Sequence, residues 1–129
     1  MNLSLASVLR AAAMSVPVSV IGNVVLWFAG GAIGADWTAP PGGAVQTVTI
    51  GPVVVASILP NLIAGFVYFG MSRTLGERTP RVFAIVSVIL CLLSMGGPAA
   101  APQALTGVLL GLMHVVSALA ITVPLVRVR

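Results

Sequence analysis

Four long apolar stretches dominate this sequence, and the short segments around them hold nearly all of its charge. They cover about residues 11–30, 50–71, 82–97 and 105–126. A bilayer core of about 30 Å needs roughly 20 apolar residues in a helix, which these stretches meet or approach. Only 6% of the 129 residues are charged and 59% are hydrophobic, whereas a soluble domain carries about 25% charged residues. The sequence therefore predicts an integral membrane protein.

The stretches predict helices rather than the strands of a membrane barrel. Each is continuously apolar, without the alternation of apolar and polar residues that barrel strands show. We expect one all-α transmembrane domain over residues 1–129, folded as a four-helix bundle. An external loop at 31–49 and a cytoplasmic loop at 72–81 would connect its spans.

The arginines predict the orientation of the bundle. They fall before the first span, between the second and third, and after the fourth: Arg10, Arg73, Arg78, Arg81, Arg127 and Arg129. With four spans, these segments share one side of the membrane, while the two opposite loops carry no basic residue and only Asp36. The positive-inside rule makes the arginine side cytoplasmic. We expect both termini inside, in a multi-pass protein of a bacterial cytoplasmic membrane.

A cleaved signal peptide is the alternative interpretation of the first stretch. Arg10, the apolar run and the small residues at 31–35 resemble one, and cleavage would leave three spans and an external N-terminus. The apolar core of a signal peptide has about 7–15 residues. This run is longer and contains Asn23, so a retained span is favoured.

One polar side chain from each predicted span lies at a common depth. Each is 12 or 13 residues from an arginine, about 18–20 Å along a helix. The four are Asn23, Asn61, Ser94 and His114. We therefore predict a polar layer inside the bundle, slightly outside the membrane midplane.

Small and polar residues recur at helical spacing around this layer, which is typical of the packed faces of membrane helices. The four predicted interior faces are Ser15, Ser19 and Asn23; Ser57, Asn61 and Gly65; Ser87, Cys91 and Ser94; and Gly107, Gly111, His114 and Ala118. The pairs Gly30/Gly34 and Gly107/Gly111 have the small-xxx-small spacing. We expect them to serve packing within the bundle rather than a dimer contact.

The layer has two interpretations. In the first, His114 bonds the asparagine side chains and fixes helix register, worth about 1 kcal/mol or less per bond. In the second, His114 takes up a proton or contacts the polar group of a ligand, because ionisable residues inside membranes are functional candidates. The absence of an accompanying carboxylate in the spans favours the structural interpretation.

The sequence lacks the parts of an active site. It holds no Ser/His/Asp set, phosphate loop or metal motif, so we expect no enzyme activity, cofactor or metal. His114 without a second ligand is an incomplete haem or metal site, and Cys91 is the single cysteine. The arginines form no basic stripe, which argues against nucleic acid. The expected partner is the lipid bilayer, with a homo-oligomer or a larger membrane complex left open.

Three functions fit these features. The first is a non-enzymatic accessory or interaction protein of the membrane. The second is a protein that binds or transports a small solute, a proton or a lipophilic ligand through His114. The third is an orphan subunit of a larger membrane complex, whose apolar helix surfaces would be protein interfaces.

Several short motifs follow one another in a recognisable order. Asn23 precedes Val24-Val25-Leu26-Trp27, Leu59-Pro60-Asn61 lies in the second stretch, and Met113-His114 lies in the fourth. This order resembles a family of small four-span bacterial membrane proteins, common in actinobacteria, that is catalogued only as a domain of unknown function. The resemblance covers nearly the whole chain. It implies the four-helix fold and no activity.

Overall fold

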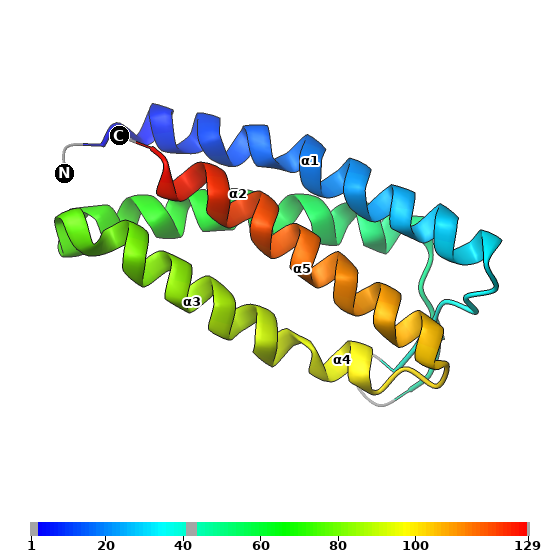
Figure 1. Cartoon of the computed structure of the whole chain (residues 1–129). Helices are drawn as coiled ribbons and strands as arrows, with labels where there is room; N and C mark the ends of the chain where they lie inside the picture. Colours follow the sequence, from blue (N-terminus) through cyan, green and yellow to red (C-terminus); the bar gives the residue numbers. More distant parts are fainter. Residues whose placement is uncertain (1–2, 41–43, 129) are drawn as a thin grey trace.

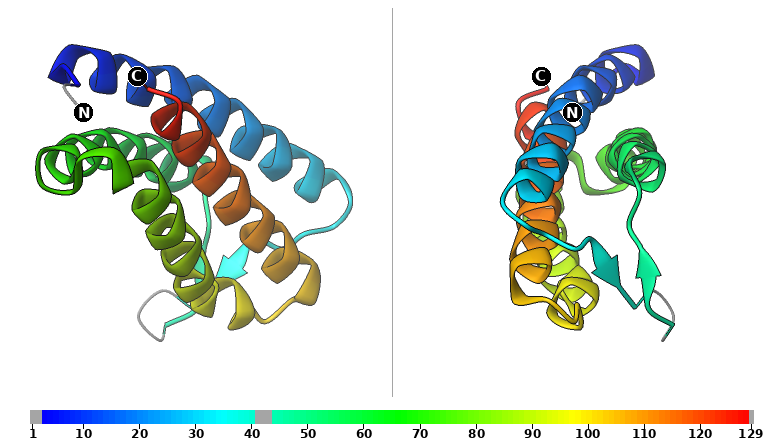
Figure 2. Two further views of the ribbon diagram at one scale, coloured as in Figure 1. Left: turned by 60° about the vertical axis from the view of Figure 1, so that its left-hand side comes forward. Right: turned by 90° about the vertical axis from the view of Figure 1, so that its right-hand side faces the viewer.

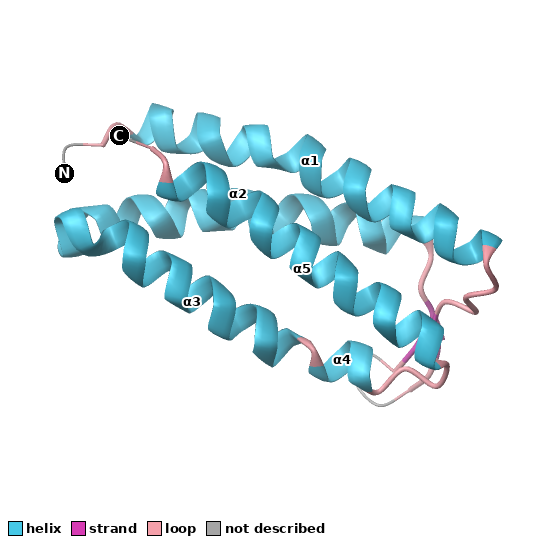
Figure 3. Cartoon of the chain, in the orientation of Figure 1, coloured by secondary structure: helices cyan, strands magenta, loops and turns pink. Residues whose placement is uncertain are grey.

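The computed structural model describes residues 3–40 and 44–128, and this part of the chain is mostly helical (Figures 1 and 3). Its helices are α1 (Leu5–Ala32), α2 (Ile50–Leu75), α3 (Thr79–Ser94), α4 (Gly96–Ala99) and α5 (Ala104–Val126). A 3-10 turn, η2 (Gly76–Arg78), joins α2 to α3. Two short strands, β1 (Thr38–Ala39) and β2 (Gln46–Thr47), pair antiparallel with Thr38 opposite Thr47.

Local signals set the ends of the helices. Ser4 caps α1, because its hydroxyl accepts the amide N–H of Ser7 at 3.0 Å. Gly76 ends α2 with a φ of +54°, in the left-handed region that glycine adopts without strain. Only η2 separates α2 from α3, so most of the loop predicted at residues 72–81 is helical.

Three helical stretches in the described chain are long and apolar enough to cross a membrane: Leu5–Ala32, Ile50–Ala99 and Ala104–Val126. The middle stretch folds back on itself at η2, so it contains two of the four predicted spans (Figure 1). The helix is interrupted at Met95, and the weak helix formers Gly96 and Gly97 begin α4.

The helices are unevenly packed. In the right-hand view of Figure 2, α1, α5 and α3 form one layer and α2 stands to one side of it. The most extensive contacts join α1 to α2 and α1 to α5, whereas α2 touches α3 and α5 only sparsely. Figures 1 and 2 both show α2 and α3 joined at η2 and separated at their other ends.

Two apolar clusters close the two ends of the molecule. The terminal-end cluster consists of Leu3, Val8, Ala12, Tyr68, Phe83 and Leu125. The hairpin-end cluster consists of Trp37, Val53, Leu109 and Met113. Both described chain ends and η2 therefore lie at one end, and the paired strands at the other (Figure 1).

Hydrogen bonds fasten the segment after α1 to the start of α5. The Thr106 hydroxyl lies 2.8 Å from Asp36 Oδ1 and 3.2 Å from the Trp37 amide nitrogen, whose N–H it accepts. The Gln103 side chain accepts the Asp36 amide N–H at 2.9 Å and donates to the Gly34 carbonyl at 2.9 Å. These contacts hold Trp37, which is 6% exposed, against the helices.

The indole of Trp37 packs where only a glycine leaves room. A Cβ atom at Gly30 would lie 2.5 Å from Trp37 Cζ2 and 2.5 Å from Leu109 Cδ1. At the neighbouring Gly31, the nearest such atom is Trp37 Nε1 at the ordinary distance of 3.5 Å. Gly30 thus serves packing within the molecule. Gly34, the other glycine of this small-xxx-small pair, has open space around it and a φ of +96°.

We predict that Gly30→Ala lowers the free energy of unfolding by about 1–3 kcal/mol, the usual range for overpacking a tight contact. Gly31→Ala is the matched control, because it gains the same helix propensity, up to about 1 kcal/mol, without a clash. Denaturant titration in mixed micelles, followed by tryptophan fluorescence, measures both. Equal stability of the two variants would contradict this packing.

We also predict that acid loosens the hairpin end. The Thr38 backbone N–H and then the Thr106 hydroxyl donate to the Asp36 carboxylate and hold its pKa below the ordinary value. The stabilisation is therefore complete above the ordinary carboxyl pKa and is lost as pH falls through the lowered one. Tryptophan-monitored unfolding at neutral and acidic pH should show this loss, and Asp36→Asn should remove its share of the pH dependence. An unchanged pH dependence in that variant would rule out Asp36 as the cause.

Candidate functional site: a polar cluster beside an apolar groove

The polar residues of α1 and α2 lie on the faces that these helices bury. Ser15, Ser19 and Asn23 repeat along one face of α1 and are between 0% and 4% exposed. Ser57 and Asn61 lie on the buried face of α2 and are 0% exposed. Polar side chains at helical spacing therefore meet between the two helices, with the apolar clusters beyond them at either end.

Asn23 connects α1 to two other helices. Its Nδ2 lies 2.8 Å from Ser57 Oγ of α2 and 2.8 Å from Ser117 Oγ of α5, and it donates to both. Ser117 Oγ is also 3.1 Å from Ser19 Oγ. A single carboxamide thus ties together the three helices that make most of the contacts in the fold.

Asn61 makes the second connection between α1 and α2. The Ser15 hydroxyl donates to Asn61 Oδ1, and Asn61 Nδ2 donates to the Ser57 carbonyl at 2.6 Å. The Ser57 hydroxyl in turn donates to the Val53 carbonyl at 2.7 Å. We call these linked side chains the polar cluster: Ser15, Ser19, Asn23, Ser57, Asn61 and Ser117.

One atom of the polar cluster is left without a partner. Asn23 Oδ1 is buried and accepts no hydrogen bond from the described residues. Exchanging the oxygen and nitrogen of this carboxamide would be worse. It would set Oδ1 2.8 Å from the Ser57 oxygen, whose proton goes to Val53, and it would leave both Nδ2 protons without an acceptor. The unpaired group at this position is therefore an acceptor.

A groove of about 900 Å³ lies between α2 on one side and α3 and α5 on the other, where these helices separate. We call it the lateral groove. Its walls are mostly aliphatic, and part of the paired-strand segment lines one end. Asn23 is the one described residue of α1 that lines it. Its other polar lining side chains are Gln46, Thr47, Ser87, Cys91, Ser94, His114, Ser117 and Thr122.

His114 lines the lateral groove and bonds to its own helix. Its Nδ1 lies 2.7 Å from the Leu110 carbonyl oxygen. A carbonyl can only accept, so Nδ1 carries the proton, and in the neutral ring Nε2 is then an acceptor. His114 makes no hydrogen bond to Asn23 or Asn61 in the described chain, so it stands beside the polar cluster rather than within it.

The structure thus arranges the four predicted layer residues in two groups. It links Asn23 and Asn61 through Ser57, but Ser94 is exposed and donates to the Cys91 carbonyl of its own helix at 2.7 Å. Ser94, His114 and Asn23 share the lining of the lateral groove, from which Asn61 is absent in the described chain.

The most buried face of α5 differs from the predicted one, and the sequence did not single out Ser117. Gly107, Gly111, His114 and Ala118 were predicted to face inward, yet all are half-buried. The buried face is formed instead by Thr106, Leu109, Met113, Ala120 and Leu125. Ser117 follows His114 by three residues, and this spacing was the available signal that a second polar side chain pointed to the same region.

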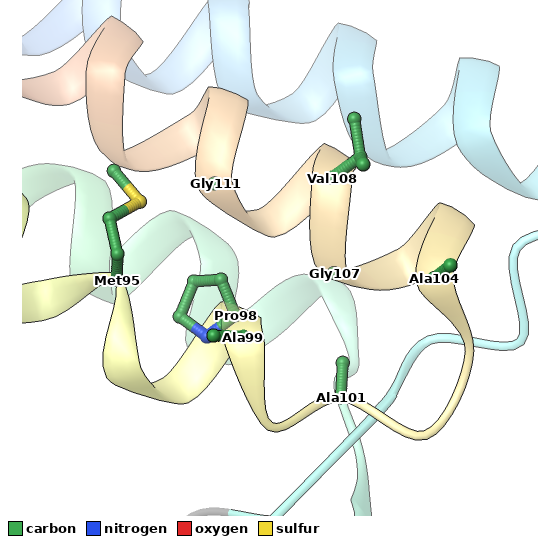
Figure 4. Close-up of a pocket in the computed structure, with 8 residues that line it drawn as sticks. All are labelled: Met95, Pro98, Ala99, Ala101, Ala104, Gly107, Val108 and Gly111. Carbon is green, nitrogen blue, oxygen red and sulfur yellow. The ribbon is translucent and has the colours of Figure 1, made fainter.

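A second, smaller hollow of about 340 Å³ lies between α4 and the start of α5. Its described lining residues have no polar side chain (Figure 4). A Cβ atom at Gly107 would lie 2.7 Å from the Pro98 carbonyl oxygen, so the chain segments approach closely here. Among the described residues, no group of three His, Cys, Asp or Glu side chains could hold a metal ion.

Comparison with known proteins places the chain in a family. The model of a family of unknown function (DUF6069) matches residues 3–129, so the chain belongs to that family, as its motifs indicated. No curated protein and no solved structure matches the chain. Membership therefore assigns no activity.

We predict that Ser57→Ala lowers the free energy of unfolding by about 1 kcal/mol, because Asn23 loses an interhelical acceptor in apolar surroundings. Ser94→Ala is the control: it removes a similar bond to the helix backbone but no bond between helices. It should change stability by less than about 0.5 kcal/mol. Unfolding in mixed micelles measures both, and equal losses would show that the interhelical bonds contribute nothing.

Proposed function

We propose that this member of DUF6069 is a multi-pass membrane protein with four spans, formed by α1, α2, α3 together with α4, and α5. Helix α3 alone rises about 24 Å, short of the bilayer core of about 30 Å. Residues 79–99, which include α4, rise about 31 Å at the same pitch. The short helix α4 thus supplies the length that α3 lacks.

Charge supports an orientation with both termini in the cytoplasm of a bacterial cell. The described arginines are all exposed: Arg10, Arg73, Arg78, Arg81 and Arg127. They flank the helix ends that meet at the terminal-end cluster, whereas the hairpin end carries Asp36. The positive-inside rule then places the terminal end in the cytoplasm and the paired strands outside.

Within the membrane, we propose that the protein binds a lipophilic ligand in the lateral groove. The observation that carries this proposal is the groove itself, whose volume lies within the usual range of about 300–1,000 Å³ for ligand sites. Such sites combine apolar walls with a few placed polar groups, and here Asn23, His114 and Ser117 are those groups. This favours the ligand-binding hypothesis over an accessory role.

Binding without catalysis fits the chemistry of the groove. Its described lining residues include no Asp or Glu, so His114 has no carboxylate to orient it as a general base. We therefore propose a carrier, sensor or store of a lipophilic molecule rather than an enzyme.

We predict that filling the groove abolishes binding of a lipophilic probe. Ala56 of α2 and Ala118 of α5 line the groove from its two sides, so Ala56→Phe with Ala118→Phe should obstruct it. The matched control is Ala13→Phe with Ala29→Phe, at two exposed positions of α1 outside the groove lining. Native mass spectrometry from maltoside micelles containing oleyl alcohol counts bound probe.

The wild-type protein and the control should each retain one oleyl alcohol, and the groove-filling variant should lose most of it. A thermal unfolding scan of all three proteins checks that the groove-filling variant is folded. Equal retention in a folded groove-filling variant would contradict binding in the lateral groove.

A further inference from the structure

We infer that the lateral groove selects an uncharged amphiphile whose head group donates a hydrogen bond, such as an alcohol, to Asn23 Oδ1. This inference rests on the proposed binding function and specifies its ligand class. It depends on three features of the groove: unpaired acceptors, the lack of charge and an apolar half toward η2.

The central feature is the divided role of the Asn23 side chain. Both protons of Nδ2 are used by Ser57 and Ser117, which fixes the carboxamide firmly in place. Oδ1 has no partner in the described chain, although Asn23 is only 4% exposed and lines the groove. An unpaired buried acceptor destabilises the protein, because it has given up its hydrogen bonds to water. Because Oδ1 is itself buried, a ligand donor reaches it only after a small shift of the side chains between it and the groove, and the new bond then removes that cost.

Two further acceptors stand near the same level of the groove. His114 Nδ1 is committed to the Leu110 carbonyl, so Nε2 of the neutral ring accepts. Pro60 has no N–H, so the carbonyl of Ala56 lacks the donor that a helix normally provides. Ala56, Pro60 and His114 all line the groove. The groove therefore offers acceptors that call for a hydrogen-bond donor on the ligand.

The lining also excludes charged head groups. No Arg, Lys, Asp or Glu is found among the described lining residues. A phosphate or carboxylate would meet acceptors without a cation, and an ammonium group would meet no carboxylate. Because burying an unpaired charge is far costlier than burying a paired hydroxyl, a neutral head group is favoured.

The half of the groove that lies toward η2 suits an alkyl chain. Between the level of Ala56 and η2, its walls are mainly apolar, and they include Ile63, Val67, Phe83 and Ile121. From Ala56 to Val67, α2 rises about 16 Å. An amphiphile with its hydroxyl at Asn23 can thus extend its chain toward the terminal end.

A pair of probes that differ in one hydrogen-bond donor tests the inference. Oleyl alcohol has an O–H, whereas oleyl methyl ether has the same chain and can only accept. Competitive native mass spectrometry of the wild-type protein should show oleyl alcohol binding about tenfold more tightly, the usual value of one such bond. Oleate, which is anionic at pH 8, should bind more weakly than the alcohol.

The variant Asn23→Leu should reduce the alcohol-to-ether ratio to about one, while both probes still bind. The alcohol-to-ether ratio of the wild-type protein tests the inference by itself, even if the Asn23→Leu variant does not fold. Equal wild-type affinities, or tighter binding of oleate, would overturn this inference and leave the lateral groove as a lipophile site. Loss of groove-dependent binding for every probe would instead overturn the proposed function.

Discussion

Hydrogen bonds between polar side chains in an apolar interior hold α1, α2 and α5 in register. Asn23 donates to Ser57 and Ser117, and Asn61 accepts from Ser15. In lipid, helices gain little from apolar burial against one another, so close packing and polar contacts decide how they associate. Small residues allow the approach, because a Cβ atom at Gly65 would lie 2.8 Å from Ala12 Cβ. The polar cluster and these contacts together fix α2 against α1.

This attachment leaves α2 only sparsely in contact with α3, and the lateral groove follows from that geometry. The helices are tied at η2 and separate toward the paired strands (Figure 2). Asn23 contributes both to the packing of the helices and to the proposed ligand site. Its nitrogen bonds to Ser57 and Ser117, and its oxygen is buried without a partner, in a residue that lines the groove.

The sequence predicted the polar faces of α1 and α2 well, because serine and asparagine at helical spacing in an apolar helix have few stable locations except the interior. It predicted the face of α5 in part. Gly107 packs against Pro98 and His114 lines the groove, whereas the buried face of the helix includes Met113. Counting residues from the arginines gives the depth of a side chain in the membrane. It does not give the direction in which that side chain leaves its helix. The attachment of Asp36 to Thr106 joins residues far apart in sequence and carried no local signal.

Photo-crosslinking can locate a lipophilic ligand on the protein. A long-chain alcohol with a diazirine next to its hydroxyl would be bound to the protein in nanodiscs, irradiated, and located by peptide mass spectrometry. We expect labels concentrated around Ala56, Leu90 and His114, which line the lateral groove from α2, α3 and α5. Labels spread over the outward residues Val25, Val55 and Val88, with none in the groove, would contradict this expectation.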